Sequence, residues 1–257
     1  MTVAQPFTTS PVPDDAKPFI AAARAMGADL GPNLSTLTDL EIAKFWVAES
    51  RNDAKALARI QATLAWRLEY DFDALLADEF ADVKRTGKLY VLPQPSRSGC
   101  SILVWRSRLH MPDPPRLPRL IRFFVKTVWG RWKEGKGSDR IVVIVSRDGV
   151  EMKHRDLTMA REAASVFNAH FPEVLNELYV YPTNWVATTI WACVRPFLDP
   201  VTASKVNFIS ADEMQKRLAD LTTPDNTPVS MGGTWEGEPV GLDPEALLKD
   251  EEVVLKS

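Results

Sequence analysis

Residues 141–145 read Ile-Val-Val-Ile-Val, an unbroken run of β-branched side chains. Such a run is typical of a strand that is covered on both faces, as in a largely parallel sheet with helices on either side. Around it, further strands are expected at 88–92, 101–106, 178–181 and 205–209, and helices at about 118–133, 157–171, 184–197 and 212–221. Strands and helices that alternate at this spacing favour right-handed βαβ crossovers. The sequence therefore predicts an α/β fold with a mixed or parallel sheet flanked by helices.

The segment before this sheet is predicted to be helical. Thr38 or Ser35 is suited to cap one helix, and apolar side chains recur at helical spacing in a second helix after residue 53. A composition rich in Pro, Thr and Asp favours a flexible lead before these helices. We divide the chain into a flexible lead (1–18), a small all-α N-terminal module (19–87), an α/β domain (88–235) and an acidic tail (236–257).

Composition narrows the class of protein. The 257 residues are 45% hydrophobic, which supplies a large core without disulfides or a structural metal. The two cysteines, Cys100 and Cys193, form no disulfide framework and fit a reducing compartment. The sequence contains no apolar run of membrane-spanning length and no signal-peptide pattern at its start. We expect a cytoplasmic protein.

Charge is concentrated in one block. Residues 84–140 contain 14 basic and 3 acidic side chains, although the whole chain has a formal charge of −3. Such a block suits docking on an anionic membrane, which adds about 1 kcal/mol for each basic side chain, or a solvated face paired with acidic segments. Cations interleaved with aromatic residues over 118–133 would also suit nucleic acid, but we interpret these aromatic residues as packing against the sheet. We expect transient contact with anionic membrane surfaces and no nucleic-acid partner.

The predicted helix at 184–197 has an unusual distribution of side chains. Its large apolar residues lie around most of its circumference, whereas a helix that only covers a sheet needs one apolar stripe. Such a helix is deeply buried in protein, covers an apolar ligand, or meets a membrane when it moves.

Four motifs in the second half of the chain resemble the CRAL-TRIO lipid-binding family, especially its phosphatidylinositol transfer proteins. Phe171-Pro172-Glu173 is similar to the family's "YPE" motif, and the strand that ends at Tyr181 runs into Pro182-Thr183-Asn184 before the apolar helix. The segment Arg195 to Val206 is similar to the pattern "KPFLDPxTxxKI", and Met231-Gly232-Gly233-Thr234 occupies the place of a later Gly-Gly pair. The order and spacing of these motifs agree with the family.

The resemblance implies a CRAL-TRIO lipid-binding fold in which one lipid occupies a deep apolar cavity. A mobile gate helix, here about 184–198, would close this cavity, and the protein would transfer lipid between membranes. The residues expected to form the cavity and gate are Val143, Val145, Tyr179, Tyr181, Trp185, Ile190, Trp191, Val194, Phe197 and Phe208. The resemblance further implies that Glu173, Thr202 and Lys205 bind the lipid headgroup, and a lysine ammonium, a hydroxyl and a carboxylate form a suitable site for an inositol phosphate.

Two departures from the family bear on the ligand. Where the family has a basic "FLRAR" motif, this chain has Phe45-Trp46-Val47-Ala48-Glu49, so an arginine that assists the phosphate is missing. Members that also bind phosphatidylcholine have hydroxyl residues on the strand that here reads Ile141-Val142-Val143-Ile144, and aliphatic side chains donate no hydrogen bond to that phosphate. We expect phosphatidylinositol as the ligand, and a sterol, tocopherol, retinoid or carotenoid as the alternative.

Other chemistry has little support in the sequence. The three histidines, His110, His154 and His170, do not have zinc-ligand spacing, and neither a nucleophile elbow nor a nucleotide-binding glycine pattern occurs. We expect no enzyme activity, no metal and no cofactor, with one alternative: haem held by Tyr179 or Tyr181 with His170, since some relatives of the family bind haem. A further hypothesis is an interaction module that exchanges no lipid. We expect a monomer.

Overall fold

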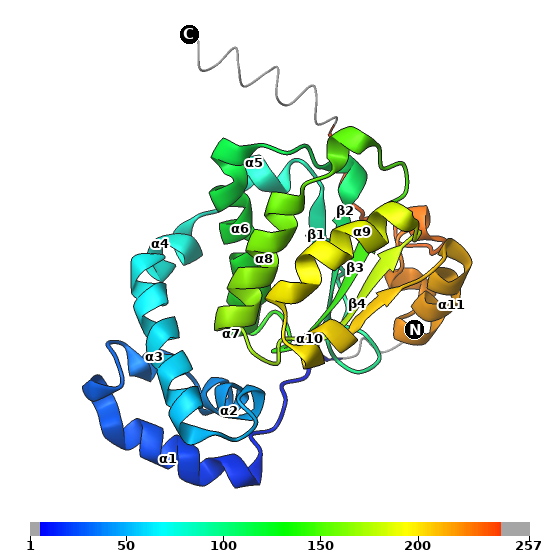
Figure 1. Ribbon diagram of the computed structural model, residues 1–257. Helices are drawn as coiled ribbons and strands as arrows, with labels where there is room; N and C mark the ends of the chain where they lie inside the picture. The colour runs from blue at the N-terminus through cyan, green and yellow to red at the C-terminus, as the bar shows by residue number, and fades with distance from the viewer. Residues whose placement is uncertain (1–5, 243–257) are drawn as a thin grey trace.

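The computed structural model describes residues 6–242 and shows a five-stranded mixed sheet in the order β1-β2-β3-β4-β5 (Figure 1). Strand β1 (Leu89–Val91) is antiparallel to β2 (Ser101–Arg106), and β3 (Ile141–Ser146), β4 (Leu175–Tyr181) and β5 (Val206–Phe208) continue in parallel. The predicted α/β fold with a mixed sheet flanked by helices is confirmed. Residues 243–257 of the predicted acidic tail lie outside the described residues.

Helices cover both faces of this sheet. Helices α6 (Leu117–Val125), α8 (Leu157–His170) and α9 (Trp185–Val194) lie over one face, where Figure 1 shows α8 and α9 side by side, and α11 (Ala211–Leu221) covers the other. Helix α6 continues through a π-helical turn at Lys126–Gly130 into α7 (Arg131–Lys133), so the predicted helix at 118–133 is one helix with a wide turn. Short helix α10 (Pro200–Ser204) precedes β5.

The two faces of the sheet differ in packing. On the closed face, defined here as the face under α11, Val142 and Ile144 are completely buried and pack with Met214 and Leu218. Neighbouring residues of a strand alternate between faces, so Val143 and Val145 belong to the opposite face, and both are only half-buried. The run at 141–145 is therefore fully covered on one face, whereas the sequence predicts cover on both.

The N-terminal helices form a lobe with its own core. Helices α1 (Lys17–Met26), α2 (Asp39–Ala48) and α3 (Asp53–Glu69) pack around Phe45 and Ile60 (Figure 1). Of the two predicted caps, Thr38 begins α2, where it forms a capping box with Glu41. Helix α1 is not expected from the sequence analysis.

The boundary of the N-terminal module differs from the predicted residue 87. Helices α4 (Phe72–Ala77) and α5 (Ala81–Lys84) contribute Phe72, Leu75, Phe80 and Val83 to the core of the α/β domain. The separate core of the module involves residues up to Leu64. The cores therefore divide near the end of α3, because α4 and α5 bury their apolar side chains against α6 instead of α2.

The described part of the predicted flexible lead lies against the α/β domain. The backbone N–H of Thr8 donates to the carbonyl of Gly99 at 3.0 Å, and the N–H of Ser10 donates to Asp139 Oδ1 at 2.8 Å. Ala16 is completely buried in the core of the module. Residues 6–18 therefore contact both the N-terminal module and the α/β domain, and they do not form the flexible lead expected from the sequence.

The start of the predicted acidic tail also packs against the sheet. Glu238 accepts hydrogen bonds from Tyr90 and Arg106, both at 3.0 Å, and Arg106 also donates to the carbonyl of Pro239. The side chains of Arg106 and Glu238 are nearly buried. These contacts place residues 236–239 with the α/β domain.

The basic block at 84–140 binds other parts of the chain. Arg119 pairs with Asp78 and Asp82, Arg122 donates to the carbonyls of Tyr70 and Asp71, and the Lys126 ammonium donates to the carbonyls of Leu76 and Asp78. These side chains hold α6 and the π-helical turn against residues 70–82, which include α4 and part of α5. The expected membrane-docking face of helix 118–133 is therefore largely engaged within the protein.

Candidate functional site

The open face, defined here as the sheet face under α8 and α9, is apolar but incompletely covered. On β3, β4 and β5 its side chains form an aliphatic surface with one aromatic ring: Val143, Val145, Leu178, Val180, Val206 and Phe208, which are in register and all half-buried. On β2 the same face is buried at Leu103 and Trp105. Every residue of α8 is also half-buried or exposed. An apolar surface that its own helices leave partly accessible suits a hydrophobic ligand.

Helix α9 lies over the open face and is itself apolar on several sides. Val186, Ala187 and Val194 are buried, Ile190 and Trp191 are half-buried, and the Trp191 ring lies 5.8 Å from the ring of Phe208 on β5. Trp185 is 75% exposed at the first turn. Helix α9 falls within the range 184–198 expected for the gate, and Trp185, one of the expected gate residues, lies on the outside.

Side-chain hydrogen bonds hold both ends of α9. Asn184 caps the helix and accepts a hydrogen bond from Arg147 at 2.8 Å, which ties the first turn to the end of β3. After the helix, the backbone N–H of Asp199 donates to Asn168 Oδ1 of α8 at 3.1 Å. A few polar contacts at the ends and an apolar underside are the features of an element able to move as a unit.

Large apolar side chains are exposed along α9 and the turns that follow it. Phe197 is 44% exposed and Val201 is 56% exposed, in addition to Trp185. Arg161 of α8 lies over the Phe197 ring at 5.8 Å, and Arg195 is exposed. Apolar groups bordered by cations are typical of a surface that meets an anionic membrane.

Two of the predicted headgroup residues form a contact at the edge of the sheet where the parallel strands begin. Glu173 precedes β4 and Lys205 precedes β5, and Lys205 Nζ lies 3.4 Å from Glu173 Oε2, with both side chains about one-fifth exposed. Arg140 precedes β3, and its Nη2 lies 4.0 Å from the same Glu173 oxygen. The sequence analysis did not single out Arg140, although its place directly before the β-branched run is a usable signal.

Thr202, the third predicted headgroup residue, has a local partner. Its hydroxyl donates to Asp199 Oδ2 at 2.6 Å and its backbone N–H donates to Asp199 Oδ1 at 2.9 Å, so Asp199 caps α10. Although burial raises the pKa of Asp199, the hydrogen bonds from Thr202 and the Lys205 charge hold it below its usual value. The hydroxyl donor of Thr202 is therefore engaged by Asp199.

Tyr179 and Tyr181, which the sequence analysis assigns to the cavity, do not lie on the open face. Both rings lie on the closed face, where Tyr179 accepts a hydrogen bond from Arg217 of α11. The neighbouring residues Leu178 and Val180 occupy the open face instead, because a shift of one residue along a strand moves a side chain to the opposite face.

His170 has different packing partners from these tyrosines. Its ring stacks on Trp66 of α3 at 4.0 Å, and its Nδ1 lies 3.1 Å from the Thr63 hydroxyl. Burial among these groups lowers the pKa of His170 to about 4. Because the tyrosines belong to the closed face and His170 to the contact with the N-terminal module, the three residues do not form the expected haem-ligand set.

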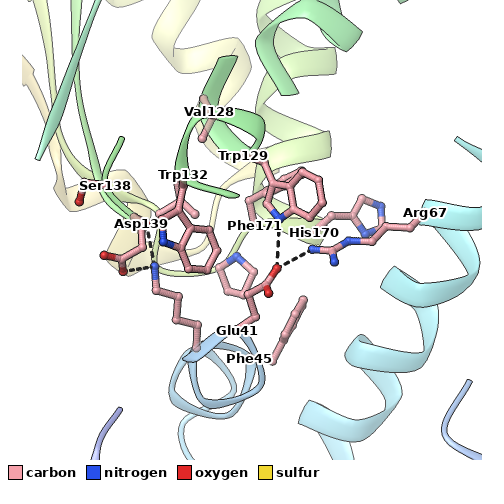
Figure 2. A pocket seen from close by; sticks show the side chains of 13 residues that line it. Glu41, Phe45, Arg67, Val128, Trp129, Trp132, Ser138, Asp139, His170 and Phe171 are labelled. Carbon is pink, nitrogen blue, oxygen red and sulfur yellow. Dashed lines mark hydrogen bonds and ion pairs between the residues drawn. The ribbon is translucent and has the colours of Figure 1, made fainter. Parts of the chain in front are cut away.

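The contact between the N-terminal module and the α/β domain is polar and closed. Figure 2 shows Glu41 of α2 between Arg67 and Trp129, which donate to its carboxylate at 3.0 and 3.1 Å, and Lys44 paired with Asp139. Burial raises the pKa of Glu41, but Arg67 and Lys133 together lower it to about 2. The cavity among these residues measures about 20 Å³, which is room for about one water. This contact joins the two parts and leaves no space for a ligand.

Comparison with known protein families agrees with this arrangement. Residues 84–233 match the model of the CRAL/TRIO domain. The chain belongs to the CRAL-TRIO family. The resemblance drawn from the motifs at 171–206 is thereby confirmed. A crystal structure of Sfh5 has the same fold, with a TM-score of 0.65 at 12% identity over 96% of this chain and 100% of that one.

Two curated relatives of this CRAL-TRIO chain are named for the transfer of phosphatidylinositol. The phosphatidylinositol transfer protein CSR1 of Eremothecium gossypii is 24% identical over 71% of this chain and 44% of its own length. The phosphatidylinositol transfer protein PDR17 of Saccharomyces cerevisiae is 26% identical over 67% of this chain and 55% of its own length. The chain thus spans about half the length of these relatives. In residues 6–242, every helix is too short or too polar to cross a membrane.

Proposed function

We propose that the chain binds one phospholipid and transfers it between membranes, with phosphatidylinositol as the preferred ligand. The observation that carries this proposal is the open face, six half-buried apolar side chains on three strands beneath an apolar helix. Each acyl methylene sheltered from water there contributes about 0.8 kcal/mol. The free energy gained by sheltering two acyl chains would therefore offset the cost of removing the lipid from the bilayer only if α9 covers these chains.

The headgroup is proposed to lie at the start of β4 and β5. Lys205 would donate to the phosphate, and Glu173 would accept from an inositol hydroxyl. Thr202 would join them by turning its hydroxyl from Asp199 toward the phosphate. The half-buried Lys205–Glu173 contact supports this role, since a lipid phosphate offers Lys205 a second anionic partner.

The transfer cycle would begin with contact between α9 and a membrane. Trp185, Phe197 and Val201 would enter the interface while Arg161 and Arg195 face anionic headgroups. Helix α9 would then open, exchange its lipid and close. In this proposal the protein is a monomeric, cytoplasmic carrier that is peripheral on membranes, with no enzyme activity and no cofactor besides its lipid.

Transfer of labelled phosphatidylinositol from donor to acceptor vesicles tests the proposal. Lys205→Ala is expected to lower its transfer about tenfold, the value of one charge-assisted hydrogen bond, while transfer of diacylglycerol stays unchanged. Lys216→Ala on α11, an exposed lysine on the other face, serves as the matched control. Equal loss for both lipids with Lys205→Ala would contradict the headgroup assignment.

A second candidate function is the carriage of a less polar ligand such as a sterol, tocopherol, retinoid or carotenoid. The observation that favours it is the engagement of Thr202 with Asp199, which leaves fewer donors for a phosphate. The visible absorption spectrum and the extracted ligand of the purified protein distinguish the two candidates. A chromophore or sterol without phospholipid supports the second.

A further inference from the structure

Each of the three strands β3, β4 and β5 begins one or two residues after a charged residue. Arg140 precedes β3, Glu173 lies two residues before β4, and Lys205 precedes β5. Because the three strands are neighbours in parallel register, these side chains meet at one edge of the sheet. One carboxylate oxygen, Glu173 Oε2, has two cations nearby, Lys205 Nζ at 3.4 Å and Arg140 Nη2 at 4.0 Å.

The Arg140 guanidinium is incompletely paired. Its Nε is buried and has no hydrogen-bond partner among residues 6–242, and the 4.0 Å from Nη2 to Glu173 is too long for a hydrogen bond. The backbone of Arg140 is nevertheless fixed, since its N–H donates to Ser138 Oγ at 3.1 Å and its carbonyl accepts from Ser101 at 3.1 Å. An arginine with a fixed backbone and unused side-chain donors is suited to bidentate binding of a phosphate.

Glu173 has a strained backbone at this point. Its φ of 56° lies in the left-handed region, which side chains other than glycine rarely adopt. The conformation turns the chain sharply between α8 and β4 and sets the carboxylate near the two cations. Backbone strain of this kind is concentrated at ligand-binding positions.

The other nearby cation is not available. Lys44 of α2 is close enough that the Arg140 charge contributes to the lowered pKa of its ammonium, after burial as the main cause. Its Nζ, however, lies 2.6 Å from Asp139 Oδ2, and the pair is almost completely buried. Besides Lys205, Arg140 is therefore the cation near Glu173 that has hydrogen-bond donors available for a ligand.

We propose that Arg140 is the second phosphate-binding residue of the lipid site and that it selects phospholipids whose headgroup carries both a phosphodiester and free hydroxyls. This inference rests on the proposed lipid-binding function. Arg140 and Lys205 donate to the phosphodiester oxygens from two sides, and Glu173, released from both cations, accepts from a headgroup hydroxyl. Phosphatidylinositol meets this description, whereas the quaternary ammonium of phosphatidylcholine offers Glu173 no hydroxyl.

Transfer assays with Arg140 variants test the inference. Arg140→Gln is expected to lower phosphatidylinositol transfer about tenfold, and Arg140→Lys, which keeps the charge but loses the fork, less than that. Diacylglycerol transfer should stay unchanged in both variants. Arg51→Gln, which removes an exposed arginine of the N-terminal module that pairs with Asp15, is the matched control and should transfer like wild type.

The outcomes separate the two levels of the proposal. If wild type transfers phosphatidylinositol and Lys205→Ala loses it while Arg140→Gln does not, the role of Arg140 is refuted and the proposed function stands. If wild type transfers no phosphatidylinositol, both fail together.

A second measurement does not depend on the folding of a variant. Phenylglyoxal modifies accessible arginines, and mass spectrometry of the wild type gives the extent at Arg140. Loading with phosphatidylinositol should reduce this modification at least severalfold, whereas loading with diacylglycerol should not. Glycerophosphoinositol, which lacks acyl chains, distinguishes the source of the phosphate. Protection by the lipid at lower concentration supports a lipid site, and protection by the soluble compound alone overturns it.

Discussion

The two faces of the same sheet are built from similar residues but are packed in different ways. On the closed face, Val142 and Ile144 are completely buried with Met214 of α11, whereas Val143 and Val145 on the open face are half-buried beneath α8 and α9. Both pairs are β-branched aliphatic residues of the same strand, so residue type does not explain their difference in burial. The difference lies in the partner, because α11 packs tightly and α9 does not.

The comparison shows where stability and binding are located. The closed face and the contact with the N-terminal module have their apolar groups buried and their charges paired. The open face keeps apolar surface accessible, which contributes less to stability than buried surface but suits a hydrophobic ligand. Stability and function are therefore separable by mutation of residues on opposite faces.

The largest expected effect compares two methionines. Met214→Ala on α11 removes a completely buried side chain and should lower the free energy of unfolding by about 3 kcal/mol. Met159→Ala on α8 removes a half-buried one and should cost less than about 1 kcal/mol. Urea denaturation of both variants measures the difference, and equal losses would contradict the distinction between the faces.

A similar loss of unfolding free energy is expected at low pH, where the contact between the N-terminal module and the α/β domain is weakened. The pKa of Glu41 falls from 4.5 to about 2 on folding, which corresponds to roughly 3 kcal/mol of stability. This contribution is present above pH 4.5 and is lost as the pH falls toward 2. Glu41→Gln should therefore destabilise the protein at pH 7 and flatten the dependence of stability on pH.

Urea midpoints between pH 2 and 7 measure this dependence. Glu69→Gln at the end of α3, an acidic residue for which no ion pair is seen among the described residues, is the control and should follow wild type. A wild type and a Glu41→Gln variant with parallel pH profiles would show that the module is not held through this carboxylate.

A smaller change in stability with a large change in binding is expected at Val180. Val180→Trp places a large ring on the half-covered open face, where it would occupy the space proposed for acyl chains. Lipid binding should fall at least tenfold while the unfolding free energy changes by less than about 1 kcal/mol. Ile144→Trp on the closed face should instead destabilise by about 1–3 kcal/mol through overpacking.

The smallest expected effect concerns the end of the gate. Asn168→Ala removes the hydrogen bond from the backbone N–H of Asp199, worth about 1 kcal/mol, and should raise hydrogen exchange after α9 about fivefold. Ser165→Ala, an exposed residue of the same helix, is the control. Unchanged exchange in Asn168→Ala would show that this contact does not hold the gate.

The sequence predicts much of this arrangement. The alternation of strands and helices predicts the sheet, the motifs at 171–206 predict the family, and the apolar periphery of residues 185–194 marks α9 as unusual. Glu173 and Lys205, named from the motifs, lie in contact at the sheet edge.

Other features depend on tertiary packing. Residues 178–181 are Leu-Tyr-Val-Tyr, and such a run does not indicate which side chains face which side of the sheet. The register of β4 places Tyr179 and Tyr181 on the closed face. The basic side chains of α6 and the π-helical turn find their partners among residues 70–82, which are distant in sequence. Arg140 joins the site only because β3 and β4 are neighbours.

Native mass spectrometry of the gently purified protein tests the central claim most directly, since it weighs the chain together with the ligand on its open face. The account predicts one phospholipid per chain, identified after extraction as phosphatidylinositol, and loss of this species in Val180→Trp. A sterol or chromophore in place of phospholipid, or a phospholipid retained equally by Val180→Trp, would contradict it.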